Sequence, residues 1–308
     1  MTHAAATIRS VPLAGLIALA TLTSCAGAAG EPGGATAPST VNLGDPGTPA
    51  INEPAARPSE YRLVWSDEFD RPGLPDPAKW AYDTARNREG WHNAERQYYS
   101  ASRPENARVE DGRLVIEARR ENFGNRAPAD YGGQQYTSAR LLTRGIADWT
   151  YGFIEVRAQL ACGRGLWPAI WMLGSADQPW PAVGEIDIME HVGHEQGTVY
   201  GTVHTGRYNH VAGTHKGSKV TLPDACTAFH RYQLHWTRDR ITIGVDDRAY
   251  FSFRNDGTGE ASWPFFRPEY LILNVAVGGN WGGAKGIDDA AFPSRMLVDY
   301  VRVWQPAQ

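Results

Sequence analysis

Cysteine is scarce in this sequence, with Cys25, Cys162 and Cys226 the only three among 308 residues. None of them has the closely paired spacing that structural zinc sites and dithiol redox motifs use. The spacing of the cysteines therefore gives no sign of either kind of site.

Positive charge is also thinly spread along the chain. The 30 Lys and Arg residues stand against 34 Asp and Glu residues, the formal net charge is -4, and no basic stripe is formed. A protein that binds nucleic acid needs such a stripe. We therefore expect no nucleic-acid partner.

The apolar run at residues 11–22 is too short to span a membrane. Because Arg9 precedes it and small residues follow, it predicts a removable export signal over residues 1–24. The run ends in Leu-Thr-Ser-Cys, which resembles the bacterial lipobox and implies a lipid anchor on Cys25. Ordinary secretory cleavage after residues 26–28 stays open. We expect an exported protein that either contacts a membrane only through Cys25 or is secreted.

Residues 25–59 are rich in Ala, Gly, Pro and Thr and show no apolar period. Such a segment buries too little apolar surface to fold, so it is predicted to be a disordered tether. Beyond it, Cys162 and Cys226 are separated by 64 positions. In an exported protein two remaining thiols are more often paired than free, which predicts a disulfide, with two buried thiols as the alternative.

Residues 60–308 show neither a helical apolar stripe nor a repeat of fixed period. Short segments that alternate apolar and polar residues, or run apolar, are separated by Gly, Asp and Asn. They are residues 113–120, 151–160, 231–236, 240–247, 270–277 and 296–304. This pattern predicts one all-β domain, an antiparallel sandwich of two sheets.

The stretch GEIDIMEHVG, residues 184–193, holds three acids: Glu185, Asp187 and Glu190. On a helix, at 100° per residue, these acids would scatter around the axis. On a strand, Glu185 and Asp187 share one face, and Glu190 falls on the other. One extra residue at Ile188/Met189, a β-bulge, would return Glu190 to the first face. The pattern therefore predicts a bulged strand with three carboxyl groups in a row.

Neighbouring carboxylates repel each other, so at least one of the three should have a raised pKa. A protonated carboxyl beside an ionised one is the pair that retaining glycoside hydrolysis uses as acid and nucleophile. The alternative, an acidic patch or a Ca²⁺ loop, fits less well because this run alternates with Ile, Ile and Met.

These residues resemble the active-site signature of glycoside hydrolase family 16, in the bulged Glu-x-Asp-x-x-Glu form of its laminarinase branch. Further matching segments extend from residue 61 to residue 304. They are LVWSDEFD (63–70), GWHNAERQYY (90–99), DGRLVIEA (111–118), TSARLLT (137–143), WTYGFIEVRAQL (149–160), GLWPAIWML (165–173), YGTVHTGRYNH (200–210) and LILNVAVGGNWGG (271–283). The resemblance implies a concanavalin A-like β-jelly roll with a concave substrate groove. It also implies that Glu185 is the nucleophile, Glu190 the acid/base, and Asp187 a hydrogen-bonding partner of the nucleophile.

Three tryptophans are candidates for stacking against sugar rings. Trp167 and Trp171 are four positions apart and would share one face of a strand, although Pro168 between them suggests that the strand starts or bends there. Trp281 lies among glycines that cannot form a core around it. In the family these positions match groove residues, with burial in the core as the alternative for Trp171.

The resemblance assigns further polar residues to the cleft. His204 matches a histidine that contacts sugar near the catalytic acids, and Asn93, Glu95 and Arg140 match polar positions on its donor side. Each has a structural alternative: His204 as an ordinary strand histidine, and Glu95 or Arg140 as half of a surface ion pair. Many relatives also hold a structural Ca²⁺ on the convex side, and the matching positions are Asp299, Gly112 and Glu68.

The sequence therefore predicts a retaining endo-β-1,3-glucanase, with mixed-linkage β-1,3-1,4-glucan as a further substrate, that acts as a monomer and needs no cofactor for catalysis. Two alternatives stay open: a galactan hydrolase of the agarase or carrageenase kind, and a non-catalytic β-glucan-binding protein. A metal hydrolase built on HVGHE (191–195) with His204, His210 and His215 is disfavoured. The spacing is neither His-Glu-x-x-His nor His-x-x-Glu-His, and Gly193 weakens the helix that such motifs require.

Overall fold

The computed structural model describes residues 54–307. The predicted export signal, Cys25 and the tether up to residue 53 lie outside the described residues. The last positions assigned to the tether are ordered against the domain: Pro54 bridges Arg248, and the Ala55 amide donates to the Asp247 carbonyl at 3.0 Å. Ala55 is buried against Gly244, and a Cβ added to Gly244 would lie only 2.2 Å from the Cβ of Ala55. The predicted boundary at residue 60 was thus several residues too late.

One sheet has seven antiparallel strands in the order β12-β11-β10-β9-β16-β7-β2. Its strands are β2 (Ala81–Tyr82), β7 (Arg140–Leu142), β9 (Leu166–Gly174), β10 (Glu185–Glu190), β11 (Thr198–His204), β12 (Lys216–Thr221) and β16 (Glu269–Val277).

The second sheet has ten strands, eight of them in the order β15-β14-β13-β8-β17-β5-β6-β3, with β1 paired to β17 and β4 to β5. Its strands are β1 (Tyr61–Asp67), β3 (Gln97–Tyr99), β4 (Ala107–Glu110), β5 (Arg113–Arg120), β6 (Tyr136–Ser138), β8 (Gly152–Gln159), β13 (His230–Trp236), β14 (Arg240–Val245), β15 (Arg248–Arg254) and β17 (Ser294–Pro306). Among the described strands only β3 and β6 pair in parallel. Three short 3-10 helices, η1 (His92–Ala94), η2 (Gly124–Arg126) and η3 (Asp289–Ala291), complete the described elements.

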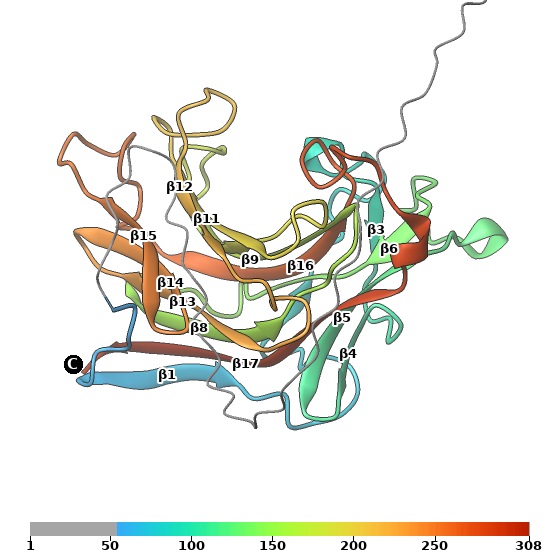
Figure 1. Cartoon of the computed structure of the whole chain (residues 1–308), viewed down its shortest axis with the longest axis horizontal. Coiled ribbons are helices and arrows are strands. Elements are labelled where there is room, and N and C mark those ends of the chain that lie inside the picture. The colour runs from blue at the N-terminus through green and yellow to red at the C-terminus, as the bar shows by residue number, and fades with distance from the viewer. Residues whose placement is uncertain (1–53, 308) are drawn as a thin grey trace, which may run out of the picture. The chain divides into compact units, whose positions relative to one another are not determined.

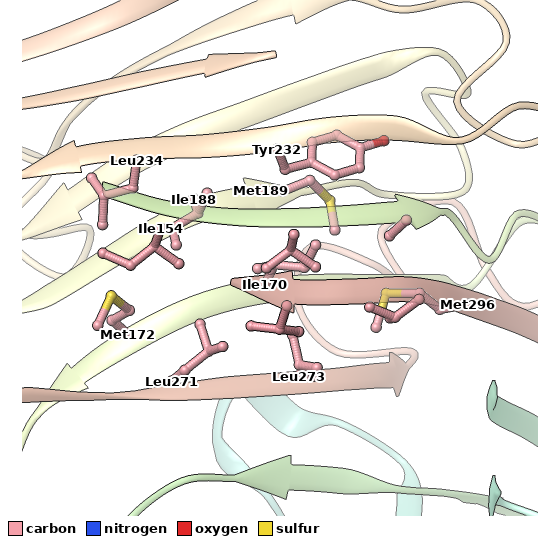
Figure 2. Packing of buried hydrophobic residues seen from close by; sticks show 14 of the residues in the cluster. Ile154, Ile170, Met172, Ile188, Met189, Tyr232, Leu234, Leu271, Leu273 and Met296 are labelled. Atoms are coloured by element: carbon pink, nitrogen blue, oxygen red, sulfur yellow. The ribbon is translucent and has the colours of Figure 1, made fainter. Parts of the chain in front are cut away.

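The two sheets pack face to face around one core. In Figure 1, strands β9, β11 and β16 lie over β8, β13 and β17. Ile170 and Met172 of β9 are fully buried, and Figure 2 shows them gathered with Leu234 of β13 and other apolar side chains between the strands. The period-two alternation thus sends one face of each strand into the core, which confirms the predicted all-β sandwich.

Two further sequence predictions are settled by the fold. Cys162 and Cys226 form a disulfide, as predicted. Strand β9 begins at Leu166 and runs through Pro168, which pairs with Val275, so the strand does not start at the proline. No helix in the described part of the chain is long and apolar enough to be a membrane span.

Candidate active site

The three acids lie on β10, and the predicted bulge is present. The register of β10 shifts between Asp187 and Glu190 against β11, and between Asp187 and Met189 against β9. Ile188 and Met189 are consecutive, yet both are fully buried in the core. The phase of the strand therefore changes by one residue, and Glu190 joins Glu185 and Asp187 on the outer face.

Indole N–H groups hold two of these carboxylates. Trp180, in the loop before β10, donates to Glu185 Oε2 at 2.9 Å. Trp167 of β9 donates to Glu190 Oε1 at 3.1 Å. Each indole stabilises the ionised form of its acid and fixes the rotamer of the carboxyl group.

His204 contacts the acids from β11, where it lies opposite Glu185 in the register. Its Nε2 is 3.4 Å from Asp187 Oδ2 and 3.8 Å from Glu185 Oε1. A ligand atom from each of these three residues lies within 4.8 Å of the others, so the group has the donors for a metal ion. His204 therefore lies in direct contact with the carboxyl row.

A cavity of about 380 Å³ opens over this row. Aromatic and apolar side chains of β9 and β16 form much of its lining, and the acids form its floor. The lining residues are His92, Asn93, Glu95, Arg140, Trp167, Ala169, Trp171, Leu173, Trp180, Glu185, Asp187, Glu190, His210, Val211, Asn274 and Ala276. An apolar cleft with a few convergent polar groups is the usual form of a ligand site.

Burial raises the pKa of all three acids, because removal from water disfavours the charged form. For the two glutamates, the charge of Asp187 is the second-largest cause of the raised pKa. These causes raise the pKa of Glu185 to about 8, whereas the pKa of Glu190 rises well above its ordinary 4.5. His204 and the indole N–H groups oppose the shift in both. The row therefore keeps protons at neutral pH, and Glu190 is suited to donate one.

Arg140 and Trp171 are held together at one side of the cavity. The Arg140 guanidinium pairs with Asp83 at 3.0 Å and stacks 4.7 Å from the Trp171 ring and 5.1 Å from the Trp91 ring. Trp171 Nε1 donates to Asn274 Oδ1 at 2.8 Å. Trp171 therefore lines the cavity in a fixed orientation and does not belong to the core between the sheets.

Of the other predicted cleft residues, Asn93 and Glu95 line the cavity and Trp281 lies beside it. Gln97 donates to Glu95 at 2.8 Å. Trp281 is not among the lining residues; its ring packs edge-on against Trp167 and Tyr200, with centroids 5.4 Å and 4.9 Å away. Trp281 thus supports Trp167 from the side, and a sugar contact for it stays a prediction.

Sequence reasoning missed Trp180, Asn274, His210 and Glu269. Trp180 and His210 come from loops, and their ring centroids lie 4.9 Å apart beside His204, with the planes tilted by 38°. Glu269 is buried, and burial, followed by the charges of Glu185 and Asp187, raises its pKa well above 4.5. The prolines flanking Trp180, directly before the acid row, were the signal available for the first of them.

The residues proposed for Ca²⁺ already have partners. Asp299 accepts a bond from Arg157 at 2.6 Å, and Glu68 is held by both Nε and Nη2 of Arg302. Gly112 lies in the turn between β4 and β5. Both side chains are thus already held by arginines. Calcium also takes backbone carbonyl oxygens as ligands, and calcium binding stays a prediction.

A cleft across a two-sheet β-sandwich, with a row of buried carboxyl groups on its floor and indoles on its walls, defines a glycoside hydrolase. Comparison with known proteins gives the family. The model for Glycosyl hydrolases family 16 matches residues 94–302, and this chain belongs to that family.

Individual relatives agree with this assignment. A beta-glucanase from Rhodothermus marinus is 52% identical over 256 residues, which cover 80% of this chain and 85% of that protein. The X-ray structure of the laminarinase from Rhodothermus marinus has a TM-score of 0.76 and 51% identity over 80% of this chain and 98% of that chain. A mutant of SCLam, a non-specific endo-beta-1,3(4)-glucanase from family GH16, has a TM-score of 0.81 and 60% identity over 84% of this chain and 100% of that chain. It was co-crystallised with 1,3-beta-D-cellotriosyl-glucose and presents 1,3-beta-D-cellobiosyl-glucose at its active site.

The raised pKa of Glu185 predicts a pH-dependent stability. Between its ordinary pKa and about 8 this carboxyl binds more protons in the folded than in the unfolded chain, so it stabilises the fold in acid and loses that contribution as the pH rises. Glu185→Gln removes this dependence. We expect the melting temperature of the variant, relative to wild type, to increase from about pH 5 to about pH 8.

Glu68→Gln is the matched control, because the pKa of Glu68 is shifted in the opposite direction. A hydrogen bond from Arg302 lowers it. This carboxylate stabilises the fold above its ordinary pKa and loses the contribution as the pH falls, so Glu68→Gln should lose stability at neutral pH and approach wild type in acid. If the melting temperatures of Glu185→Gln and wild type differed by the same amount at every pH, that result would contradict the electrostatic account.

Proposed function

We propose that this protein is an endo-β-1,3-glucanase that works by double displacement with retention, and that it also cleaves mixed-linkage β-1,3-1,4-glucan. The observation that carries the proposal is the bulged β10 strand, which sets three protonatable carboxyl groups under an indole-lined cleft. The names of the relatives, beta-glucanase, laminarinase and endo-beta-1,3(4)-glucanase, support glucan as the substrate.

In the first step Glu190 protonates the oxygen of the leaving sugar while Glu185 attacks the anomeric carbon. The C–O bond to the leaving sugar breaks as the bond to the Glu185 carboxylate forms. In the second step Glu190, now ionised, removes a proton from water, which attacks the same carbon and releases Glu185. The raised pKa of Glu190 suits it to donate the proton, and the bond from Trp180 stabilises the ionised form of Glu185 that attacks.

Asp187, Trp180 and Trp167 are positioning residues in this scheme. Trp180 holds Glu185 by one hydrogen bond and leaves its other oxygen near His204. Trp167 holds Glu190 on the opposite side of the row. Asp187 lies between them, and its charge raises the pKa of both glutamates.

The electrostatics of the cleft favour a neutral polysaccharide over a sulfated one. Arg140 is the only Lys or Arg among the described residues that line the cavity, and it is already paired with Asp83 and stacked between two indoles. Burial, the largest cause, lowers the pKa of His92 and of His210, so neither ring adds positive charge at neutral pH. A sulfate group would find no free cation there.

A substrate panel tests the proposal. Laminarin, mixed-linkage β-glucan, agarose and κ-carrageenan are each incubated with the enzyme, with Glu190→Gln as the blank, and products are sized by chromatography. We expect oligosaccharides from laminarin and from mixed-linkage glucan. Products from a galactan alone would contradict the assignment of the cleft to glucan, and binding of laminarin without any product would indicate a glucan-binding protein.

The proposed export, the lipid on Cys25 and the monomeric state are independent of this chemistry. The export signal and the lipidation motif, which lie outside the described residues, support the first two. Mass spectrometry of the mature N-terminus would identify the lipid.

A further inference from the structure

A second group of reactive side chains lies behind the acid row, around the disulfide. Cys162 follows β8, Cys226 precedes β13, and His191 directly follows Glu190 at the end of β10. The two sulfurs and one ring nitrogen of His191 all lie within 4.8 Å of one another. These three residues come from separate segments of the chain, which is why the spacing of the cysteines gave no sign of the cluster.

His191 is unusual because it is fully buried and neither ring nitrogen has a hydrogen-bond partner among the described residues. A buried polar atom without a partner destabilises a fold. An imidazole with no partner can offer the lone pair of one ring nitrogen to a ligand.

We propose that reduction of the disulfide opens a thiolate-histidine site for a soft or borderline divalent metal ion such as Zn²⁺, held by Cys162, Cys226 and His191. A small thiol supplies the electrons: two RSH become RSSR as the Cys162–Cys226 bond becomes two thiols. Binding the metal then releases two protons as the thiols become thiolates. Zinc takes two thiolates at about 2.3 Å and an imidazole at about 2.0 Å, which matches this donor set, and water or a further side chain takes the fourth position.

The site would replace one crosslink by another. In the oxidised chain the disulfide ties the segment after β8 to the segment before β13. A metal on the same sulfurs would restore that link and add His191. We therefore expect reduction to lower the melting temperature and the metal to raise it again, because a ligand that binds only the folded chain stabilises it.

The cluster is coupled to the catalytic strand through the backbone. The His191 amide donates to the Pro168 carbonyl at 3.2 Å, one residue from Trp167, which holds Glu190. Gly193 packs so closely on the residue after Cys162 that an added Cβ would lie 1.7 Å from the Gly163 carbonyl oxygen. The sulfurs and the acid/base are thus joined by few bonds.

Cobalt is the probe, because Co²⁺ on thiolates gives charge-transfer absorption that oxygen and nitrogen ligands do not. The full chain is reduced with a phosphine, which does not compete as a thiol would, and Co²⁺ is titrated in. We expect one equivalent per chain to produce the thiolate band and Zn²⁺ to displace it. The oxidised chain should show no band. The readout is optical, so it is independent of glucanase activity.

His191→Leu and the matched control His235→Gln separate a built site from two free thiols. Leucine fills a similar volume and needs no hydrogen bond, so His191→Leu should fold. The control residue, His235, lies on β13 and has Tyr61 as its hydrogen-bond partner. We expect His191→Leu to weaken Co²⁺ binding by at least about tenfold and His235→Gln to leave it unchanged. Equal affinity in all three proteins, no band in the reduced wild type, or unfolding on reduction that metal does not reverse would each overturn the proposal.

Discussion

Glu185→Gln is expected to lower kcat on laminarin by at least about 10⁴-fold, the scale on which enzymes lose activity when a covalent nucleophile is removed. The amide of glutamine has nearly the shape of the carboxyl group and still accepts the bond from Trp180. It cannot form the glycosyl ester, so the first step is blocked whatever the leaving group. Binding of the glucan should change little, because the walls of the cleft are untouched.

The measurement compares kcat on laminarin with kcat on an aryl β-glucoside of a laminari-oligosaccharide, and calorimetry gives the affinity of the unmodified oligosaccharide. Both rates should fall together in Glu185→Gln. Glu110→Gln, on β4 of the other sheet, is the control and should retain wild-type rates. Substantial activity on the aryl substrate in Glu185→Gln would mean that Glu185 is not the nucleophile.

The sequence predicted the part of the site that one strand determines. The bulge followed from two facts about β10: Ile186, Ile188 and Met189 need burial, and the three acids need to face outward. Both are properties of neighbouring residues, so a local pattern was enough. The same reasoning correctly placed Trp167 and Trp171 on one face of β9, because their spacing is a multiple of two.

The sequence could not predict contacts made across the sheet. Asn274 is 103 positions from Trp171, yet β16 lies beside β9 and brings the two side chains within 2.8 Å. Arg140 lines the cavity, and only the fold shows that Asp83 and two indoles surround its guanidinium. Such partners depend on strand order, which the alternation of apolar residues leaves undetermined.

The sequence also could not predict which titratable side chains are buried. Glu269 has the pattern of a polar start to an apolar strand, but it is buried, and one of its carboxyl oxygens has no partner among the described residues. His191 has the pattern of a polar turn and is equally buried. In both cases the surrounding side chains come from distant segments, so only the assembled sandwich shows that these groups have left water.

Glu190→Gln should show a different defect, one that depends on the leaving group. Without the acid, departure of a sugar alkoxide is slow, and kcat on laminarin should fall by about 10²–10⁴-fold. A nitrophenolate leaves without protonation, so on the aryl substrate the first step should stay fast. The second step should then be slow, because no base activates water. We expect a burst of one nitrophenolate per enzyme followed by slow turnover.

Azide distinguishes the two glutamates. It attacks the glycosyl-enzyme without a general base, so it should accelerate turnover of Glu190→Gln and give the β-glycosyl azide, because two inversions retain configuration. The amide oxygen that Glu190→Gln introduces can still accept the bond from Trp167, which leaves the geometry of β9 and β10 intact. In Glu185→Gln azide has no intermediate to attack, and any product should be the α-azide. The reverse pattern in the two variants would exchange the roles of Glu185 and Glu190 while leaving both in the mechanism.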